Sequence, residues 1–536
     1  MAAYSTKGLD HLGLISGMNK ELGIAKLIDQ ALPQQSDDKL ISYGQLVEAM
    51  ILNGLGFVGR TLHMYPEYFR DRPVERLLGK GIKAEYINDD ALGRCLDQLY
   101  EAGVSDIYQM LSASVVQHLE LPCEGINLDS TSIHVDGNYE HDDESKAVKL
   151  VRGYSRDHRP ELNQVVLNLI TENKAGIPVY MQAASGNIND NQGFKNIVKH
   201  HISSLKAAQD CQYFIADAAL YTAESIQSLD EQKQLFISRA PQKLKQVKNA
   251  IAEQASLTFE PLDNGYRGAW LSSEYGEVKQ RWLLIESEQA KKREQHTLDK
   301  RMEKESSAAF KSFKKLSRQR FSCSLDADKA LKVWLKAHKE IIAMSDSDIL
   351  KHSVFKQSGR PKLNQQPDSY EYQITGQLYS VLSKRQQRLQ EKGMFMLATN
   401  DLSETLTMEK MLSLYKSQQS VEKGFRFLKS PDFLTSSLYL KKPERIEALL
   451  MVMTCCLMVY AALEHKIRRE LKAQSVCFPN LKYKPCQNPT ARWVFFCFQG
   501  IHVLTISGEQ QLVLNVEERN SIIINCMGSI YQEIYS

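Results

Sequence analysis

Apolar side chains at the start of the chain recur every three or four residues, which is the period of an amphipathic helix. Leu9–Leu32 and Ile41–Gly59 carry this pattern, and a third such segment follows Asn88, a residue type that caps helix starts. Residues 1–122 are therefore predicted to form a helical N-terminal domain. Short helices of this kind build either a helix-turn-helix DNA reader or a plain bundle, and the pattern does not separate the two.

Beyond Gly125 the apolar residues gather into short runs that are typical of strands. Three such runs are followed by a helix, a fourth strand, another helix and a fifth strand. This order predicts an α/β (α+β) fold, with a mixed sheet flanked by helices. The predicted strands are Ile126–Val135, Gln164–Thr171, Pro178–Ala183, Gln212–Ala216 and Leu235–Ser238, and the first helix between them is Asn191–His201.

Residues 243–392 interrupt the sheet pattern with strand-like pieces and long charged helices, so they are predicted to be an inserted domain. The sheet pattern resumes at Met394 and leads into a long helix over Thr407–Lys429. The predicted domains are 1–122 (helical, binding DNA ends), 123–242 and 393–480 (two parts of a catalytic domain), 243–392 (the β-plus-helical insertion) and 481–536 (a mixed C-terminal segment).

The charge of the chain limits how it can bind nucleic acid. Its 536 residues carry a formal net charge of only +3, so any DNA-binding surface must be local. Between Lys291 and Arg320 stand eleven Lys/Arg and four Asp/Glu, a surplus of seven. That segment is read equally well as a DNA-backbone contact or as a pair of solvated helices.

Cysteine usage and hydropathy indicate a cytoplasmic protein that does not enter a membrane. The ten cysteines include no C-x-x-C pair and are expected to be reduced, mostly buried thiols. The longest apolar run, Ala448–Leu463, is shorter than the roughly 20 residues of a membrane-spanning helix. It is therefore predicted to be a buried core helix.

Two aspartates stand where a sheet presents functional groups. Asp129 interrupts a strand, where Asp is disfavoured, and Asp217 directly follows the apolar run Tyr213–Ala216. Carboxylates on neighbouring strand ends hold hard cations through oxygen. The alternative is that Asp217 caps a helix and that Asp129 is either an edge residue or a hydrogen-bonded one.

A third carboxylate lies on the predicted helix Thr407–Lys429. Glu422 shares one helical stripe with cations and a phenol, beside an apolar stripe able to pack on the sheet. A metal-binding carboxylate near phosphate-binding cations suits phosphodiester chemistry. The alternative is a solvated helix with a Glu422–Arg426 ion pair. The polar stripe is Tyr415, Gln418, Glu422, Arg426 and Lys429, and the apolar one is Leu414, Val421, Phe425 and Leu428.

These residues lie in segments that resemble DDE transposases of the IS-four group of insertion sequences, in the branch with a helical N-terminal domain and a long insertion. The segments are NLDSTSIHV around Asp129, YFIADAALYTAE around Asp217 and YKSQQSVEKGFRFLK around Glu422. The last matches the group's signature of Tyr, two residues, Arg, three residues, Glu, six residues, Lys. Gln418 departs from it, because it stands where the signature has Arg.

The resemblance implies an RNase H-like fold and a magnesium-dependent transposase. Asp129, Asp217 and Glu422 would be catalytic and would hold two Mg²⁺ ions, for which Mn²⁺ can substitute. The enzyme would cut double-stranded DNA at the terminal inverted repeats and transfer the 3′-hydroxyl to target DNA, as a homodimer in the bacterial cytoplasm. The residues expected to position DNA phosphates are Tyr415, Gln418, Arg426 and Lys429.

Two other functions are compatible with the same residues. One is a catalytically inactive, domesticated DNA-binding protein of the same fold. The departure from the signature at Gln418 is compatible with it. The other is a metal-dependent DNA nuclease that cuts but does not join strands.

Overall fold

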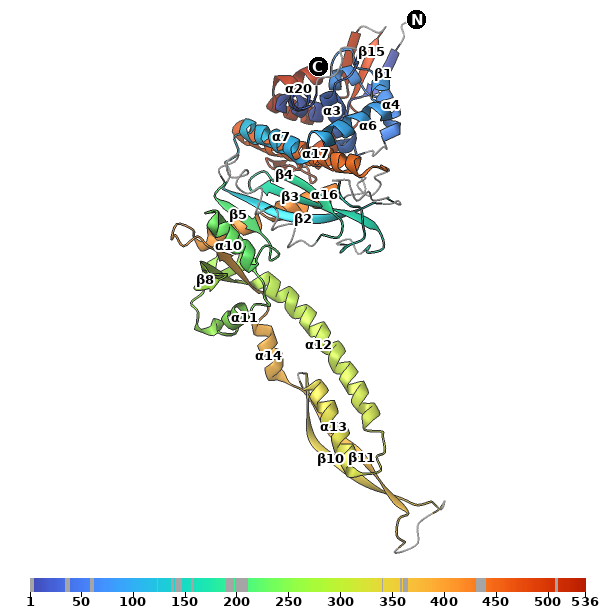
Figure 1. Cartoon of the computed structure of the whole chain (residues 1–536), viewed down its shortest axis with the longest axis vertical. Coiled ribbons are helices and arrows are strands. Elements are labelled where there is room, and N and C mark those ends of the chain that lie inside the picture. The colour runs from blue at the N-terminus through green and yellow to red at the C-terminus, as the bar shows by residue number, and fades with distance from the viewer. Residues whose placement is uncertain are drawn as a thin grey trace. The chain divides into compact units, whose positions relative to one another are not determined.

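Two compact units make up the chain in a computed structural model (Figure 1). Unit 1 comprises Met1–Arg239, Ser273–Arg281 and Ala398–Ser536, and unit 2 comprises Ala240–Ser272 and Trp282–Leu397. The residues that the structure describes are 4–33, 39–57, 62–122, 124–135, 139, 147–155, 159–188, 197, 211–339, 341–356, 359, 365–429, 440–506 and 510–536.

The N-terminal part of unit 1 is helical, as predicted. The α-helices are α1 (Leu12–Leu22), α2 (Ile24–Ala31), α3 (Tyr43–Leu55), α4 (Tyr65–Arg70), α5 (Val74–Leu78), α6 (Asp89–Glu101) and α7 (Val104–His118), with short 3-10 turns at Leu62–Met64 and Ala84–Tyr86. Polar caps mark the start of α3 and α6: the Ser42 hydroxyl accepts from the Gln45 N–H at 3.1 Å, and the Asn88 side chain accepts from the Ala91 N–H at 2.9 Å.

A mixed sheet follows, and it contains all five strands predicted from the sequence. The first three are antiparallel neighbours: β2 (Gly125–Val135), β3 (Asn163–Glu172) and β4 (Pro178–Ser185). Two further strands run parallel to β2, namely β5 (Tyr213–Ala216) and β6 (Leu235–Ala240). The mixed α/β fold with flanking helices is therefore confirmed. The helix predicted over residues 191–201 lies, Ile197 apart, outside the described residues.

The full sheet has nine strands in the order β4-β3-β2-β5-β6-β12-β9-β8-β7. Its apolar strands are covered by helices: α7 packs on β4, and α10 (Ala223–Glu231) connects β5 to β6. The added strands are β7 (Glu260–Leu262), β8 (Tyr266–Tyr275), β9 (Val278–Ser287) and β12 (Met394–Thr399).

The long helix predicted over Thr407–Lys429 is two helices, α15 (Met408–Lys416) and α16 (Gln419–Leu428). The intervening Ser417 keeps helical dihedrals, φ −61° and ψ −19°, so the chain bends rather than turns back. The Ser417 hydroxyl lies 2.6 Å from the Leu414 carbonyl and 3.1 Å from the Asn127 side chain of β2. The prediction of a single helix is therefore wrong: the helix is interrupted at Ser417, whose hydroxyl bonds both to the preceding turn and to β2.

α17 (Pro443–Ala473) is the central helix of unit 1. It lies between the N-terminal helices and the sheet, and it contacts α1, α3, α6, α7, α16 and β4 (Figure 1). By length and composition α17 could cross a membrane, but 83% of its most apolar window is buried inside the protein. It is thus a core helix, as the bounded apolar run predicts.

The C-terminal segment packs on the beginning of the chain. β15 (His502–Ile506) pairs with β1 (Tyr4–Gly8) on one side and β16 (Gln510–Leu514) on the other. Glu21 of α1 accepts hydrogen bonds from Lys466 of α17 at 2.6 Å and from Tyr531 at 2.9 Å. The remaining elements are β13 (Phe478–Pro479), β14 (Pro485–Cys486), α18 (Ala491–Cys497), α19 (Glu518–Met527) and α20 (Ser529–Ile534).

Unit 2 carries most of the inserted sequence, including the long charged helices predicted there. A small apolar cluster, which includes Phe313 and Trp334, joins two of these helices to a β-hairpin. The elements are α11 (Lys245–Ala252), α12 (Glu288–Leu316), α13 (Ser324–His338), β10 (Ile342–Val354), β11 (Ser369–Ser380) and α14 (Leu382–Gln390), with short 3-10 turns at Gln254–Ser256 and Asp263–Gly265.

The cysteines follow the predicted state with one exception. Eight of them are free thiols, and five of these eight are buried. Cys211, directly before β5, is disulfide-bonded, which contradicts the expectation of reduced thiols at that position.

Replacement of Glu48 in α3 is expected to change how stability depends on pH. Burial raises the pKa of this carboxyl to about 7, against the opposing effects of the Ala25 N–H and of Lys20. A raised folded-state pKa contributes stability that is present below the unfolded value of 4.5 and is lost as pH rises through 7. Glu48→Gln should therefore stabilise the protein at pH 8, by up to about 3 kcal/mol, and have little effect near pH 4.

Urea unfolding of unit 1 at both pH values measures this difference. Glu67→Gln, at an exposed position of α4, is the matched control and should give the same small change at each pH. An equal effect of Glu48→Gln at pH 4 and pH 8 would contradict the assignment.

Candidate active site

Strand register brings Asp129 and Asp217 side by side. In the parallel pair of β2 and β5, Leu128 is opposite Ala216, so the next residue on each strand is an aspartate. Directly opposed residues point to the same face, and neighbouring strands lie about 4.8 Å apart. The two carboxylates therefore leave the sheet in one row. Weak as separate signals, they form a pair once the register is known.

Hydrogen bonds fix the chain at Asp217. The Asp217 carboxylate accepts from the Ala219 N–H at 2.9 Å, which makes a tight turn after β5. The Asp217 carbonyl accepts from the Ser238 hydroxyl of β6, also at 2.9 Å. The end of β5 is thus held both by its own turn and by the neighbouring strand.

Arg239 extends this row, and sequence reasoning missed it. Ala216 pairs with Ser238 in the parallel register of β5 and β6, so Arg239 stands next to Asp217. The sequence does contain a signal: an apolar strand run ends in Asp217 in YFIAD, and an equivalent run ends in Arg239 in LFISR. At this level of the sheet the neighbouring segments therefore carry Asp129 within β2, Asp217 directly after β5 and Arg239 near the end of β6.

Tyr415, near the end of α15, interacts electrostatically with Asp217, Arg239 and Glu422. Burial is the main cause of the raised pKa of its hydroxyl, and the nearby Asp217 and Glu422 carboxylates raise it further. The Arg239 guanidinium, which hydrogen-bonds to the hydroxyl, opposes this shift. The Tyr415 hydroxyl is thus within electrostatic reach of two acidic residues and in contact with Arg239.

The bend between α15 and α16 holds this helix pair over the row. Ser417 lies 3.1 Å from the Asn127 side chain, and Asn127 is two residues before Asp129 on β2. Because alternate strand residues share a face, Asn127 and Asp129 point to the same side of the sheet. The helix pair is therefore tied to the face that carries Asp129.

Glu422 projects from the first turn of α16. Its side chain is exposed, whereas its neighbours Val421 and Phe425 are buried at 0% and 6% exposure. A carboxylate is favoured at this end of a helix by the helix dipole. Both Glu422 and Arg426 are exposed and lie in the described part of the chain, and no ion pair joins them there.

The other predicted phosphate-binding residues are spread along the bent helix pair. Gln418 is half-buried and immediately precedes α16, and Lys429 is half-buried and immediately follows it. Arg426 is exposed in the last turn. The four apolar residues of the neighbouring stripe, Leu414, Val421, Phe425 and Leu428, are all buried, so the predicted packing face is confirmed.

The oxygen donors of Asp129 and Asp217 suit a hard cation, but they do not surround one. Asp129 and Asp217 provide adjacent oxygen donors of the kind that Mg²⁺ prefers. Within the described residues no group of three or more acidic, histidine or cysteine side chains is close enough to hold a metal ion, so Glu422 does not complete a closed cluster. Asn127 lies two residues before Asp129, and its Nδ2 atom is buried with no hydrogen-bond partner among the described residues.

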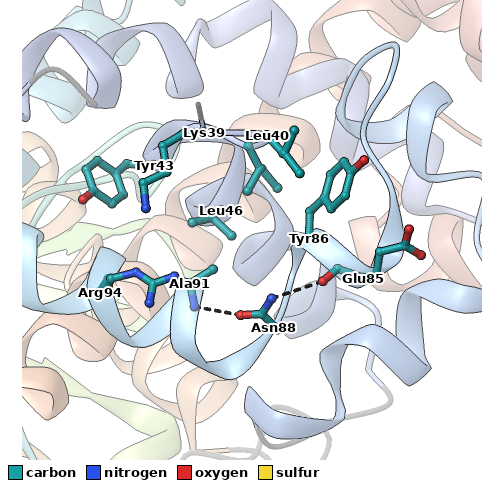
Figure 2. Close-up of a pocket in the computed structure, with 10 residues that line it drawn as sticks. Lys39, Leu40, Tyr43, Leu46, Glu85, Tyr86, Asn88, Ala91 and Arg94 are labelled. Carbon is teal, nitrogen blue, oxygen red and sulfur yellow. Dashed lines mark hydrogen bonds between the residues drawn. The ribbon is translucent and has the colours of Figure 1, made fainter. Parts of the chain in front are cut away.

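A separate cavity of about 220 Å³ lies among the N-terminal helices (Figure 2). Tyr43 and Tyr86 line it, but the row formed by Asp129, Asp217 and Arg239 (below, the acidic row) does not. Its Asn88 amide is already engaged: it caps Ala91 at 2.9 Å and donates to the Glu85 carbonyl at 3.2 Å, as Figure 2 shows. The cavity is therefore distinct from the candidate active site.

Comparisons with known proteins indicate the family of the chain. The family described as "Transposase DDE domain" matches residues 124–459, and a domain of unknown function, DUF4277, matches residues 4–113. A search of curated proteins finds no match. Among solved structures, the piggyBac transposase synaptic complex with hairpin DNA is similar at 10% identity, covering 92% of this chain and 82% of that one. Its TM-score of 0.38 is too low to support an argument, whereas the family match spans more than half of this chain. The chain belongs to the DDE transposase family.

Proposed function

We propose that the protein cuts DNA at the ends of a mobile element and joins the freed 3′-hydroxyl to target DNA. The observation that carries this proposal is the register of β2, β5 and β6, which aligns Asp129, Asp217 and Arg239 in one row across neighbouring interior strands of the sheet. Phosphodiester cleavage needs acidic groups for metal ions and a cation for the phosphate, and this row offers both.

Asp129, Asp217 and Glu422 are proposed to hold two Mg²⁺ ions, or Mn²⁺ in their place. Metal ions bound there would lower the pKa of a nucleophilic water and stabilise the leaving oxygen. Glu422 is exposed on α16, and its carboxylate is proposed to join the other two when metal ions and DNA are bound.

Cationic and phenolic side chains around the row are proposed to orient the DNA. Arg239 would grip a phosphate with its planar guanidinium, and Tyr415 would present its hydroxyl beside it. Lys429 and Arg426 would bind phosphates further along α16. Gln418 would contribute a neutral hydrogen bond where related transposases have Arg, which makes Arg239 the compensating cation.

The remaining assignments follow from this chemistry. The substrate would be double-stranded DNA, in the form of terminal inverted repeats and a target, and a homodimer would pair the two element ends. The sheet would be RNase H-like, the element an insertion sequence of the IS-four group, and the enzyme would work in the bacterial cytoplasm.

Glu422→Gln should abolish metal-dependent cleavage. Its loss removes a carboxylate from the proposed metal site, so the rate should fall on the order of a hundredfold or more. The assay is cleavage of a duplex that contains the DNA flanking the gene, with Mg²⁺ present. Glu409→Gln, on the first turn of the neighbouring helix α15, is the matched control. A wild-type rate for Glu422→Gln would refute the triad.

Arg239→Gln should slow the same reaction by about ten- to a hundredfold, because one charged phosphate contact is lost. Arg239→Lys should recover part of the rate, since it keeps the charge but not the planar fork. Arg70→Gln, at an exposed position of α4, controls for the loss of a surface charge. If Arg239→Gln cleaves at the wild-type rate, a phosphate-binding role for Arg239 is excluded.

Strand joining separates a transposase from a simple nuclease. A pre-cut element end with a 3′-hydroxyl should become covalently joined to a supercoiled target plasmid, as seen on a denaturing gel. The same end with a dideoxy terminus should give no joined product. Cleavage without joining would favour the nuclease alternative.

A further inference from the structure

The basic charge of helix α12 is concentrated at its distal end. Residues 291–308 contain six Lys/Arg and four Asp/Glu, a net charge of +2. Residues 309–320 contain five Lys/Arg and no Asp/Glu, a net charge of +5. Most of the positive surplus of this segment therefore lies within its last twelve residues.

Ion pairs neutralise much of the first part of α12. Exposed carboxylates of this part also pair with cations from elsewhere in unit 2, as Asp299 does with Arg385 at 2.8 Å. Salt bridges of this kind use up charge that DNA could otherwise bind. The cations paired here are Lys291 with Glu286 at 2.7 Å, Lys292 with Glu288 at 2.7 Å and Arg301 with Glu305 at 2.8 Å.

The distal cations form one outward stripe, which we call the α12 stripe and which consists of Lys311, Lys314, Lys315 and Arg318. All four are exposed, and no ion pair with any of them exists among the described residues. Lys311, Lys314 and Lys315 belong to α12, whereas Arg318 stands in the turn after α12 ends at Leu316. At about 100° per residue the three lysines lie roughly 100° to 200° around the helix axis from Phe313. Phe313 is buried, so the stripe faces away from the core of unit 2.

The inner face of the same turns is firmly anchored. Ala309 and Phe313 pack with Leu331 and Trp334 of α13, and the Trp334 indole donates to the Ser312 hydroxyl at 2.8 Å. The backbone under the stripe is therefore held in place, so the four cations keep a fixed spacing. From Lys311 to Arg318 there are seven steps along the chain, or about 10 Å at the rise of a helix.

We propose that the α12 stripe binds the phosphate backbone of double-stranded DNA. The inference rests on the proposed function, because it supplies that enzyme with a second DNA contact in unit 2, remote in sequence from the acidic row. Duplex DNA carries one negative charge per about 1.7 Å of its axis, so about 10 Å of helix meets enough phosphates for all four cations.

Duplex DNA fits this surface better than other anionic partners. Proteins that bind single strands add a succession of exposed aromatic side chains on which bases stack. On α12 the exposed large apolar side chain is Phe310, at 45% exposure, and it stands alone among the described residues of that helix. A cationic stripe without a row of stacking platforms is suited to a backbone contact that ignores base sequence.

The test measures how salt weakens binding of the full-length protein to a 30-base-pair duplex of arbitrary sequence, without divalent metal. Each neutralised phosphate contributes about 0.9 to the slope of log affinity against log salt. Changing Lys311, Lys314, Lys315 and Arg318 together to Gln should reduce that slope by about 3 to 4. Because these side chains face solvent, the melting temperature should be unchanged.

A matched control removes the same net charge from paired positions of unit 2. The control variant carries Gln at Lys292, Arg301, Lys332 and Arg385, each of which has a carboxylate partner. Its slope should fall by less than about 1. An equal fall of the salt slope in both variants would mean that only the overall charge matters. An unchanged slope in the stripe variant would mean that the stripe does not contact DNA. Either result overturns the proposal.

Two further measurements keep the outcomes distinct. If a single strand of the same length shows the larger slope change, the surface binds single strands and the duplex assignment is wrong. Cleavage by the wild-type protein, measured separately, tests the proposed function itself. If the wild-type protein cleaves DNA but the stripe variant keeps the wild-type salt slope, only this inference is refuted. A protein that never cleaves but loses slope in the stripe variant refutes only the catalytic proposal.

Discussion

Parallel pairing of β5 with β2 and with β6 is the constraint on which the candidate site depends. The pairing sets Asp129, Asp217 and Arg239 in one row, although they are 88 and 22 residues apart in the sequence. A slip of one residue in either pair would send a side chain to the other face. The apolar residues of β5, all buried, resist such a slip because it would turn the core side chains outward. The hydrophobic core therefore determines the geometry of the polar site.

The second requirement is the position of α16 over this row. Gly424 allows α16 to approach α17 closely, because a Cβ there would lie 2.9 Å from the Leu457 side chain. Phe427 adds an aromatic contact with Tyr460 of α17 at 4.6 Å between ring centres. The apolar side of α16 is thus fixed on the central helix, while Glu422 stays exposed on its other side. The packing residues and the candidate carboxylate thus lie on different faces of the same ten-residue helix.

Local patterns were enough to predict the strands, the buried helix and the mixed fold. They also pointed to Asp129, Asp217 and Glu422 as candidates, whose catalytic roles stay a prediction. Arg239 was missed because its importance comes from strand register, a long-range property that one sequence does not display. The bend at Ser417 was missed because it depends on Asn127, which lies 290 residues away. Likewise, the distribution of ion pairs along α12 requires knowledge of which carboxylates come near it.

The pairing of β1 with β15 has a consequence for how the protein is made. Tyr4 is opposite Ile506, so β1 cannot pair until the ribosome has added about 500 further residues. At about 5–20 residues per second this delay is roughly 25 to 100 s. During that time the face of α1 that later receives Tyr531 and Tyr535 remains uncovered. The N-terminal helices therefore cannot finish folding on the ribosome, and a chain that stops short of residue 506 leaves apolar surface exposed to chaperones and proteases.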